Sequence, residues 1–299
     1  MAESSGEIER LPMNDFRKPS WLLKRITPDA SGRDVRALLR QQSLHTVCES
    51  AMCPNLGECF SRRTATFLIM GDICTRNCGY CAIAPGRPAP LDPEEPDRIA
   101  ETSANLGLRH VVVTSVTRDD LPDGGAAHFA ETIHAIRRRS PSAVIEVLIP
   151  DFRGSRPALQ TVLQAEPDIL NHNVETVPRL FRTARPQGDY QRSLDLLAAA
   201  KAGMRSGHTK SGLMVGLGET EEDVHQVMRD LRQVDCDIFT AGQYLRPSKA
   251  HLDVKEYWPP ERFESLKNYG ESLGFLLVFA APYVRSSYMA DQFKVGTKR

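Results

Sequence analysis

The stretch TFLIMGDICTRNCGYC, residues 66–81, joins an apolar run to three closely spaced cysteines. Its first five residues are apolar or β-branched, and the run is short enough for a buried β-strand. Cys74, Cys78 and Cys81 follow in the spacing Cys-x3-Cys-x2-Cys. The pattern therefore predicts a strand that ends in a cysteine-rich loop.

The strand at residues 66–70 is the first of six apolar, β-branched runs that alternate with helical patterns. Proline starts two of the helical segments and glycine follows the end of several, as is common at helix boundaries. The predicted strands are 66–70, 110–114, 144–149, 168–173, 209–215 and 237–243, and the predicted helices are 96–105, 126–139, 156–164, 190–202, 221–234 and 260–273.

Six successive β-then-α units imply a parallel sheet, because each connection is long enough to contain a helix. Eight units would close a complete barrel, whereas six predict an open α/β fold, a partial (β/α)6 barrel of TIM type. A doubly wound open sheet remains the alternative. In both architectures ligands bind at the C-terminal ends of the strands, so we expect the cysteine loop to lie on that rim.

The two ends of the chain fall outside the alternating pattern. We expect residues 1–63 to form an N-terminal extension packed on the barrel, residues 64–280 to form the barrel, and residues 281–299 to form a C-terminal tail.

The overall composition is that of an ordinary globular protein. Thirty-eight basic residues balance 38 acidic ones, so net charge favours neither nucleic acid nor an acidic membrane surface as a partner. No apolar stretch approaches the roughly 18 residues that a membrane span needs, and the N-terminus lacks the apolar core of a secretory signal. These features predict a soluble, cytoplasmic protein, which we expect to be a monomer.

Cysteine is the residue whose distribution is unusual. Six of the seven cysteines lie within 34 residues, and only Cys236, which we expect in apolar packing, stands apart. A secreted disulfide scaffold is usually shorter, and its cysteines are spread more evenly. In a reducing compartment, this clustering indicates metal ligands.

Three kinds of site compete for Cys74, Cys78 and Cys81. A structural zinc site needs four ligands, and a redox dithiol of Cys78 and Cys81 leaves Cys74 unexplained. In a [4Fe–4S] cluster with three thiolates, the fourth iron stays open to a ligand. The spacing favours the cluster and leaves the other two sites as alternatives.

The Cys-x3-Cys-x2-Cys motif, with the aromatic Tyr80 before its last cysteine, resembles the radical S-adenosylmethionine (SAM) enzymes. The resemblance implies that Cys74, Cys78 and Cys81 bind a [4Fe–4S] cluster whose open iron chelates SAM, with Tyr80 beside the cofactor. One electron from such a cluster cleaves the sulfonium to methionine and a 5′-deoxyadenosyl radical. The open iron would then be the reason for three cysteines instead of four.

A second triplet, CESAMCPNLGEC at residues 48–59, has the spacing Cys-x4-Cys-x5-Cys and resembles the auxiliary-cluster motif of the lipoyl synthase family. The resemblance implies a second [4Fe–4S] cluster on Cys48, Cys53 and Cys59. It extends to KPSWL (18–22), SVTRDDLPDGGA (115–126), NHNVETV (171–177), KSGLMVGLGE (210–219), QYLRPS (243–248) and RSSYMA (285–290).

This resemblance implies a sulfurtransferase that inserts two sulfur atoms, at C6 and C8, into an octanoyl chain on a lysine of a lipoyl carrier domain. Those carbons are unactivated, so no general base can remove their protons, whereas a radical can take the hydrogen atom. The auxiliary cluster would be the sulfur donor. Implied partners are 2-oxoacid dehydrogenase E2 subunits, the glycine cleavage H protein, a low-potential donor such as ferredoxin or flavodoxin, and iron–sulfur assembly proteins.

The same resemblance gives the auxiliary cluster a fourth ligand, a serine of the RSSY motif that corresponds to Ser287. A hydroxyl is a harder and weaker ligand for iron than a thiolate, so it would be lost readily as the cluster is dismantled. The neighbouring Ser286 is the alternative, and both serines could instead form an ordinary turn.

Polar residues at the ends of the predicted strands are candidates for binding SAM. Thr114 and Ser115 could bond the methionine amino or carboxylate group, and Asn173 and Glu175 the ribose hydroxyls. Arg185 could pair with the methionyl carboxylate through its guanidinium fork. For each of these residues a loop cap or a surface ion pair is the alternative.

Two other functions compete with sulfur insertion. A methylthiotransferase acting on tRNA or protein would be expected to have an added RNA-binding domain and a different auxiliary spacing. A non-catalytic iron or redox sensor would not need a barrel with a polar rim. The sequence shows neither the added domain nor the different spacing, and it predicts a barrel with a polar rim. These observations favour the sulfur-inserting enzyme over both alternatives.

Overall fold

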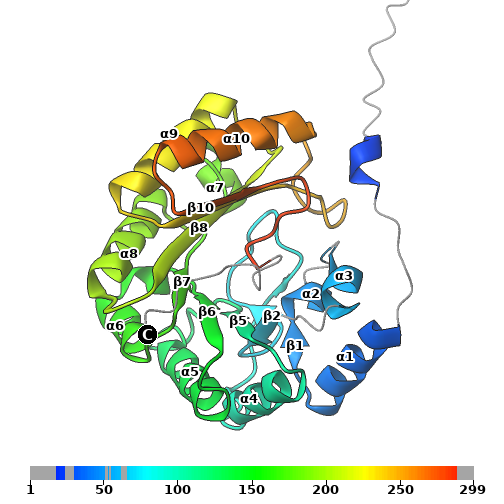
Figure 1. Cartoon of the computed structure of the whole chain (residues 1–299), viewed down its shortest axis with the longest axis vertical. Helices are drawn as coiled ribbons and strands as arrows, with labels where there is room; N and C mark the ends of the chain where they lie inside the picture. Colours follow the sequence, from blue (N-terminus) through cyan, green and yellow to red (C-terminus); the bar gives the residue numbers. More distant parts are fainter. Residues whose placement is uncertain (1–17, 24–29, 51–52, 54, 62–65, 288–299) are drawn as a thin grey trace, which may run out of the picture.

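The computed structural model describes residues 18–23, 30–50, 53, 55–61 and 66–287. Within them an eight-stranded sheet runs in the order β1-β2-β5-β6-β7-β8-β9-β10, and it curves with helices along its outer face (Figure 1). Its strands are β1 (His45–Thr46), β2 (Thr66–Ile69), β5 (His110–Ser115), β6 (Val144–Leu148), β7 (Ile169–Asn171), β8 (His208–Val215), β9 (Ile238–Gln243) and β10 (Leu277–Ala280).

From β2 to β10 every neighbouring pair in this sheet is parallel, and the strands follow one another in chain order. A doubly wound sheet would reverse its order at a switch point, and no reversal occurs along the described strands. The end strands are β1 and β10, so the barrel is open. The predicted partial (β/α)6 barrel is thus confirmed.

The helices lie close to their predicted positions. The six that follow strands are α4 (Glu95–Asn105), α5 (Ala126–Arg139), α6 (Arg156–Gln164), α8 (Tyr190–Gly203), α9 (Glu221–Gln233) and α10 (Pro260–Ser272). In addition, the short η3 (Pro178–Leu180) and α7 (Phe181–Ala184) stand between β7 and α8, and η2 (Phe152–Gly154) stands between β6 and α6.

Helix α9 shows why such boundaries can be predicted locally. Thr220 accepts a hydrogen bond from the Asp223 N–H, and the Asp223 carboxylate accepts one from the Thr220 N–H, so the two residues form a capping box. Along the helix Val224, Val227, Met228 and Leu231 are buried, at the spacing of one helical face. The preceding GLGET is therefore the strand-to-helix turn.

Strand β10 is an addition to the predicted set. It follows α10 and pairs in parallel with β9, from Leu277 beside Ile238 to Ala280 beside Ala241. Only four residues long, it gives too short a periodic signal to be distinguished from an apolar loop. The strand matters for the site because the C-terminal tail begins directly after it.

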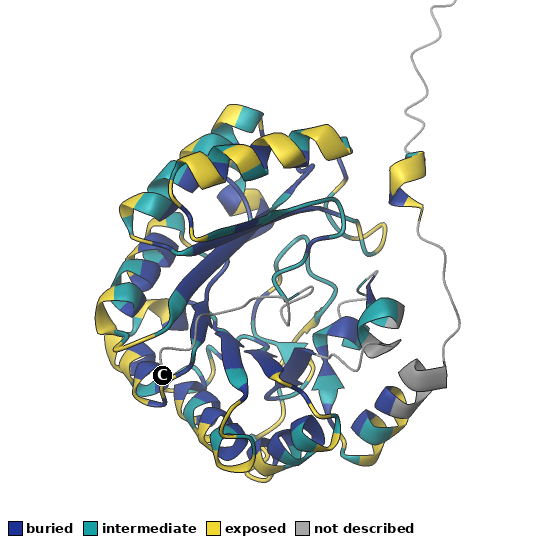
Figure 2. Ribbon diagram, viewed as in Figure 1, coloured by how far each residue is buried: buried dark blue, intermediate teal, exposed yellow. Residues whose placement is uncertain are grey.

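The hydrophobic core fills the space between the sheet and its helices, so the strands are buried while the outer helical faces are exposed (Figure 2). The lone Cys236 belongs to this core, as expected. Inside the barrel, Val112, Ile169 and Ile238 form a smaller apolar layer.

A buried ion pair lies among the strands. Lys210 Nζ is 2.8 Å from Glu146 Oε1, and His110 Nε2 is 3.2 Å from Glu146 Oε2. Burial alone would raise the pKa of Glu146, but Lys210 and His110 outweigh it and lower this pKa to about 2. Since a buried charge is tolerated only when paired, Lys210 is a structural cation of the barrel.

The N-terminal segment packs against the open edge of the barrel. Helices α1 (Ala30–Gln41), α2 (Val47–Ser50) and α3 (Leu56–Ser61) stand next to β1, which pairs antiparallel with β2 (Figure 1). Val35, Leu39 and Cys48 belong to the same core as Phe67 of β2. The domain boundaries at residues 63 and 280 stay predictions. In the part of the chain that is described, no helix is long and apolar enough to cross a bilayer.

Candidate active site

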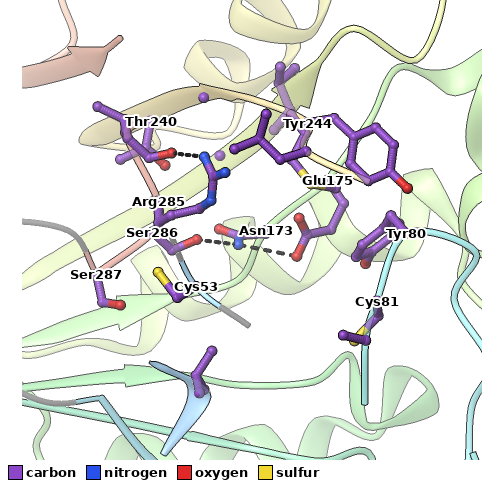
Figure 3. Close-up of a pocket in the computed structure, with 18 of the residues that line it drawn as sticks. Cys53, Tyr80, Cys81, Asn173, Glu175, Thr240, Tyr244, Arg285, Ser286 and Ser287 are labelled. Carbon is purple, nitrogen blue, oxygen red and sulfur yellow. Dashed lines mark hydrogen bonds between the residues drawn. The ribbon is translucent and has the colours of Figure 1, made fainter. Parts of the chain in front are cut away.

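A cavity of about 450 Å³ opens inside the barrel, between the strands, the N-terminal segment and the C-terminal tail. Figure 3 shows Cys53 and the tail serines at one side, Tyr80 and Cys81 at the other, and Asn173 and Glu175 between them. Residues of both cysteine triplets line it together with the predicted polar residues: Cys48, Cys53, Tyr80, Cys81, Thr114, Asn173, Glu175, Ser286 and Ser287.

The first triplet lies on a compact loop directly after β2. Cys74 ends the short strand β3 (Ile73–Cys74), which pairs with β4 (Ala84–Pro85), and the Cys81 N–H donates to the Cys78 carbonyl. All three cysteines are half-buried, and Cys81 is the one that reaches the cavity wall. Burial raises the pKa of the Cys78 thiol, and it raises that of Cys81 to about 12. Metal binding would therefore have to displace these protons.

The second triplet is held by two short helices. Cys48 lies on α2 and Cys59 on α3, and the Cys53 N–H donates to the Cys48 carbonyl at 3.1 Å. Asn55, inside the motif, donates from Nδ2 to the Tyr283 carbonyl at 2.7 Å. This bond ties the second triplet to the C-terminal tail, 228 positions away.

The tail brings two serines to the cavity. Thr66 Oγ1 donates to Ser287 Oγ at 2.7 Å, and Asn173 Nδ2 donates to Ser286 Oγ at 2.6 Å. The tail approaches β9 closely at Gly242, where a Cβ atom would collide with the Val284 carbonyl. Both serine hydroxyls line the cavity, so Ser287 stays the predicted iron ligand with Ser286 as its alternative.

Glu175 reaches the cavity from an unusual backbone conformation. Its φ of 69° is left-handed, which a residue other than glycine rarely adopts, and its N–H and carbonyl pair with Gly212 and Met214 of β8. Burial raises the pKa of its carboxyl group, whereas Arg185 and Asn173 act in the opposite direction. Such strain is often retained where it aims a functional side chain.

The other predicted cofactor residues divide into two groups. Thr114 lines the cavity and donates to the Leu148 carbonyl at 2.8 Å. Ser115 and Arg185 are not among the lining residues. Arg185 is buried, and its Nη1 donates to the Asn173 carbonyl at 2.9 Å. Thr114 and Ser115 separate in this way because successive side chains of a strand point to opposite faces.

The residues present fit iron–sulfur clusters and a polar cofactor. None of the seven cysteines, all of which lie in the described ranges, forms a disulfide bond. Asn173 Oδ1 is buried at the cavity and has no hydrogen-bond partner within the described ranges, as expected of an atom that awaits a ligand. In those ranges no three His, Cys, Asp or Glu side chains converge on one metal ion. That criterion concerns a single ion, whereas each thiolate of a [4Fe–4S] cluster binds a different iron.

Other residues that line the cavity had no role predicted from the sequence. Tyr244 and Arg246 lie in QYLRPS, a motif that had no assigned role, and Thr66 is the first residue of β2. Lys18 of KPSWL also lines the cavity. The motifs themselves were a usable signal, but strand alternation alone does not indicate which of their side chains face inward.

Comparisons with known proteins agree with this geometry. The profile of the Radical SAM superfamily matches residues 68–231. In solved structures the fold is similar to Streptococcus suis SuiB, at 12% identity and a TM-score of 0.55, covering 76% of this chain and 52% of that one. It is also similar to HydG, a maturase of the FeFe-hydrogenase, at 14% identity and a TM-score of 0.53, covering 84% and 69%. These likenesses show the shared fold.

Curated relatives are much closer in sequence. The lipoyl synthase of Caldanaerobacter subterraneus subsp. tengcongensis is 58% identical over 275 residues, which are 92% of this chain and 96% of that protein. The chain belongs to the lipoyl synthase family. The lipoyl synthase of Methylococcus capsulatus is 54% identical over 96% of this chain and 91% of its own length.

Membership of the lipoyl synthase family confirms the predicted enzyme class. The chain is a radical SAM enzyme of the sulfur-inserting type, and neither the methylthiotransferase nor the redox sensor is supported. The superfamily implies SAM and one [4Fe–4S] cluster as cofactors. The individual ligands and the second cluster remain predictions.

Proposed function

We propose that the chain inserts two sulfur atoms, at C6 and C8, into the octanoyl chain on a lysine of a lipoyl carrier domain. In this proposal Cys74, Cys78 and Cys81 hold a [4Fe–4S] cluster with SAM. Cys48, Cys53 and Cys59, with Ser287, hold a second one. The observation that carries the proposal is that thiols of both triplets, Cys81 from one and Cys48 and Cys53 from the other, line one cavity.

The cavity wall suits an aliphatic chain between these two groups of thiols. Apolar side chains line it alongside the polar ones: Val47, Leu148, Leu213, Met214 and Val284. Each methylene that leaves water for such a wall contributes roughly 0.8 kcal/mol. An octanoyl chain would therefore bind here without any polar contact of its own, held between the two cysteine groups.

When bound, the two clusters and SAM supply hydrogen-atom abstraction from an unactivated carbon and the sulfur that replaces the hydrogen. The chain's own residues bind and orient. Asn173 Oδ1 and the Glu175 carboxylate offer acceptors to the ribose hydroxyls, and Thr114 offers a hydroxyl to the methionine end. Tyr80, which lines the cavity with Cys81, would contact the cofactor, and Arg185 would support Asn173 through its hydrogen bond to the Asn173 carbonyl. Holding the groups in place and excluding water is the protein's contribution.

The tail has a separate task in this proposal. Ser287 supplies an oxygen to the second cluster, and Thr66 Oγ1 donates to that oxygen at 2.7 Å. A neutral donor stabilises negative charge on the oxygen only modestly, so the ligand can still be given up as the cluster loses sulfide.

The proposed partners follow from this chemistry. The substrates would be octanoylated E2 subunits of 2-oxoacid dehydrogenases and the glycine cleavage H protein. A low-potential donor such as ferredoxin or flavodoxin would reduce the first cluster, and iron–sulfur assembly proteins would rebuild the second. Seven cysteines without a disulfide bond among them suit a reducing compartment, for which we propose the cytoplasm.

The test is anaerobic reconstitution followed by an assay with an octanoyl-lysyl peptide, SAM and dithionite. We expect about eight irons per chain, 5′-deoxyadenosine, and a peptide that gains the mass of two sulfur atoms. Stoichiometric zinc, or deoxyadenosine without any sulfur in the peptide, would contradict the proposal. A peptide with an unmodified lysine serves as the control and should gain no mass.

A further inference from the structure

Arg76, between Cys74 and Cys78, is buried although it lies in the middle of a loop. Only 5% of the residue is exposed, and its guanidinium makes a two-pronged ion pair with Asp119, with Nε at 2.7 Å from Oδ2 and Nη2 at 3.0 Å from Oδ1. Nη2 also lies 2.6 Å from Asp151 Oδ1. Taking a charge out of water costs several kcal/mol unless it is well paired, so this burial requires its partners.

The partners come from the ends of different barrel strands. Asp119 follows β5, and the completely buried Asp151 follows β6. Asp151 also accepts the Arg153 N–H at 3.1 Å and pairs with Arg192 of α8 at 3.2 Å. Burial would raise the pKa of Asp151, but Arg76 outweighs it and keeps that pKa well below its usual range. We refer to Arg76, Asp119, Asp151 and Arg192 as the loop anchor; it contains two cations and two anions.

The loop anchor stands next to a set of hydrogen bonds on Cys74. The Thr117 N–H donates to Cys74 Sγ at 3.3 Å, and the Arg76 N–H donates to the same sulfur at 3.4 Å. Thr75 connects the two segments, because its Oγ1 donates to the Thr117 carbonyl at 2.9 Å and accepts the Asp119 N–H at 3.0 Å. Both N–H groups on the sulfur therefore belong to segments that the Arg76–Asp119 pair holds together.

Hydrogen bonds to a cluster's cysteine sulfurs are one of the factors that set its reduction potential. An N–H group stabilises negative charge on sulfur, and the reduced cluster carries one more negative charge than the oxidised cluster. Losing such donors makes reduction harder. The loop anchor can therefore influence the reduction potential, because it fixes where these N–H groups lie relative to Cys74 Sγ.

We propose that Arg76 is a positioning residue: its ion pairs with Asp119 and Asp151 hold the Arg76 and Thr117 N–H groups against Cys74 Sγ and so raise the reduction potential of the cluster on Cys74, Cys78 and Cys81. This inference rests on the proposed function only in that these three cysteines bind a [4Fe–4S] cluster. The potential is measurable without any product, so the two can fail separately.

The experiment measures the potential of this cluster alone. In a background of Cys48→Ala, Cys53→Ala and Cys59→Ala, the chain should hold about four irons, and the paramagnetic signal of the reduced cluster reports its potential in an anaerobic redox titration. We expect Arg76→Gln to disfavour reduction by about tenfold, which is about 59 mV for one electron. Arg229→Gln, an arginine of α9 paired with Glu222, is the matched control and should change nothing.

Arg76→Lys separates geometry from charge. Lysine keeps the positive charge but cannot make the two-pronged pair with Asp119, so positioning predicts a shift in Arg76→Lys as well. A direct effect of charge predicts that Arg76→Lys keeps the original potential, and that result would overturn the proposal.

Thr75→Val covers the case in which the Arg76 variants do not fold. It removes the Thr75 hydroxyl bonds to Thr117 and Asp119 without changing any charge, and we expect a smaller shift in the same direction. Unchanged potentials in Arg76→Gln and Thr75→Val, with full iron content, would overturn the inference and leave the proposed function intact. An iron-free background chain would contradict the proposed function and the inference with it.

Discussion

Thr66 Oγ1 donates a hydrogen bond of 2.7 Å to Ser287 Oγ, and this bond joins the first residue of β2 to a tail 221 positions further along the chain. Asn55 and Tyr283 make a second bond between the N-terminal segment and the same tail. The segment around Asn55 and Thr66 and the tail up to Ser287 thus meet at the cavity, where Cys48 and Cys53 lie. This arrangement brings together the proposed ligands of the second cluster from segments that are distant in sequence.

Ser287→Ala tests the proposed oxygen ligand. We expect sulfur insertion to fall by about 10- to 100-fold, the usual cost of disturbing a metal site, while SAM cleavage continues. Peptide mass and deoxyadenosine are measured in the same reaction. Ser286→Ala is the variant for comparison, because it removes the neighbouring hydroxyl, which accepts from Asn173 and is the alternative ligand. If Ser286→Ala lost sulfur insertion and Ser287→Ala did not, the ligand would be Ser286.

Cysteine replacements should separate the two clusters. Cys48→Ala is expected to lower the iron content to about four per chain and to abolish sulfur insertion, while SAM cleavage remains. Cys78→Ala is expected to abolish both, because the reductive step is lost. Cys236→Ala is the control, since that thiol lies in the apolar core, and it should keep all the iron. Sulfur insertion by Cys48→Ala at the original rate would contradict the two-cluster proposal.

Glu175→Gln tests the proposed contact with the ribose of SAM. A hydrogen bond to a charged group contributes about 1.5–3 kcal/mol, so we expect SAM to bind about 10- to 100-fold more weakly. Anaerobic titration calorimetry measures the dissociation constant directly. Glu222→Gln, on the exposed face of α9, is the control. Equal affinity of Glu175→Gln and the original chain would remove Glu175 from the site.

His172 should make stability depend on pH. It is buried, Nδ1 lies 2.8 Å from the Ile149 carbonyl, and burial, with Arg185 nearby, lowers the pKa of its ring from 6.5 to about 4. Between these values the unfolded chain binds a proton that the folded chain does not. The contribution to stability is therefore complete above pH 6.5 and is lost as the pH falls through about 4.

Because folding lowers the pKa of His172, the unfolding free energy of the metal-free chain should fall as the pH is lowered. The contribution of His172 to this fall is about 2 kcal/mol between about pH 7 and pH 5. His172→Gln should lose that part of the slope in urea unfolding, whereas the exposed His134→Gln should keep it. Identical slopes in the original chain and His172→Gln would show that the ring titrates normally.

Most of the barrel could be predicted because its signals are local. The predicted helices at 126–139 and 156–164 coincide with α5 and α6, where apolar spacing and caps such as Ser155 act within a few residues. The cysteine spacing is equally local and led to the correct superfamily. Strand β10 was missed because four residues carry little periodicity, although its neighbour α10 was found.

The site was only partly predictable because it depends on which side chains face inward. Thr114 and Ser115 were both plausible from their place at a strand end, yet Thr114 lines the cavity and Ser115 does not. Arg185 is predicted to bind the cofactor, and it donates a hydrogen bond to the Asn173 carbonyl without being among the residues that line the cavity. Strand alternation predicts that Thr114 and Ser115 separate, but only the curvature of the sheet decides which of them faces the lumen.

The sequence by itself determined the alternation of strand and helix, the two cysteine spacings and the family. Each of these signals is carried by short stretches of neighbouring residues. Tertiary structure alone decided that Arg76 meets Asp119 and Asp151, 43 and 75 positions away, and that Ser287 meets Thr66. The Arg76 pairs form only because parallel strands bring their C-terminal ends to one rim, and the Ser287–Thr66 pair forms only because the C-terminal tail packs against the first residue of β2. No local pattern contains the register of that packing.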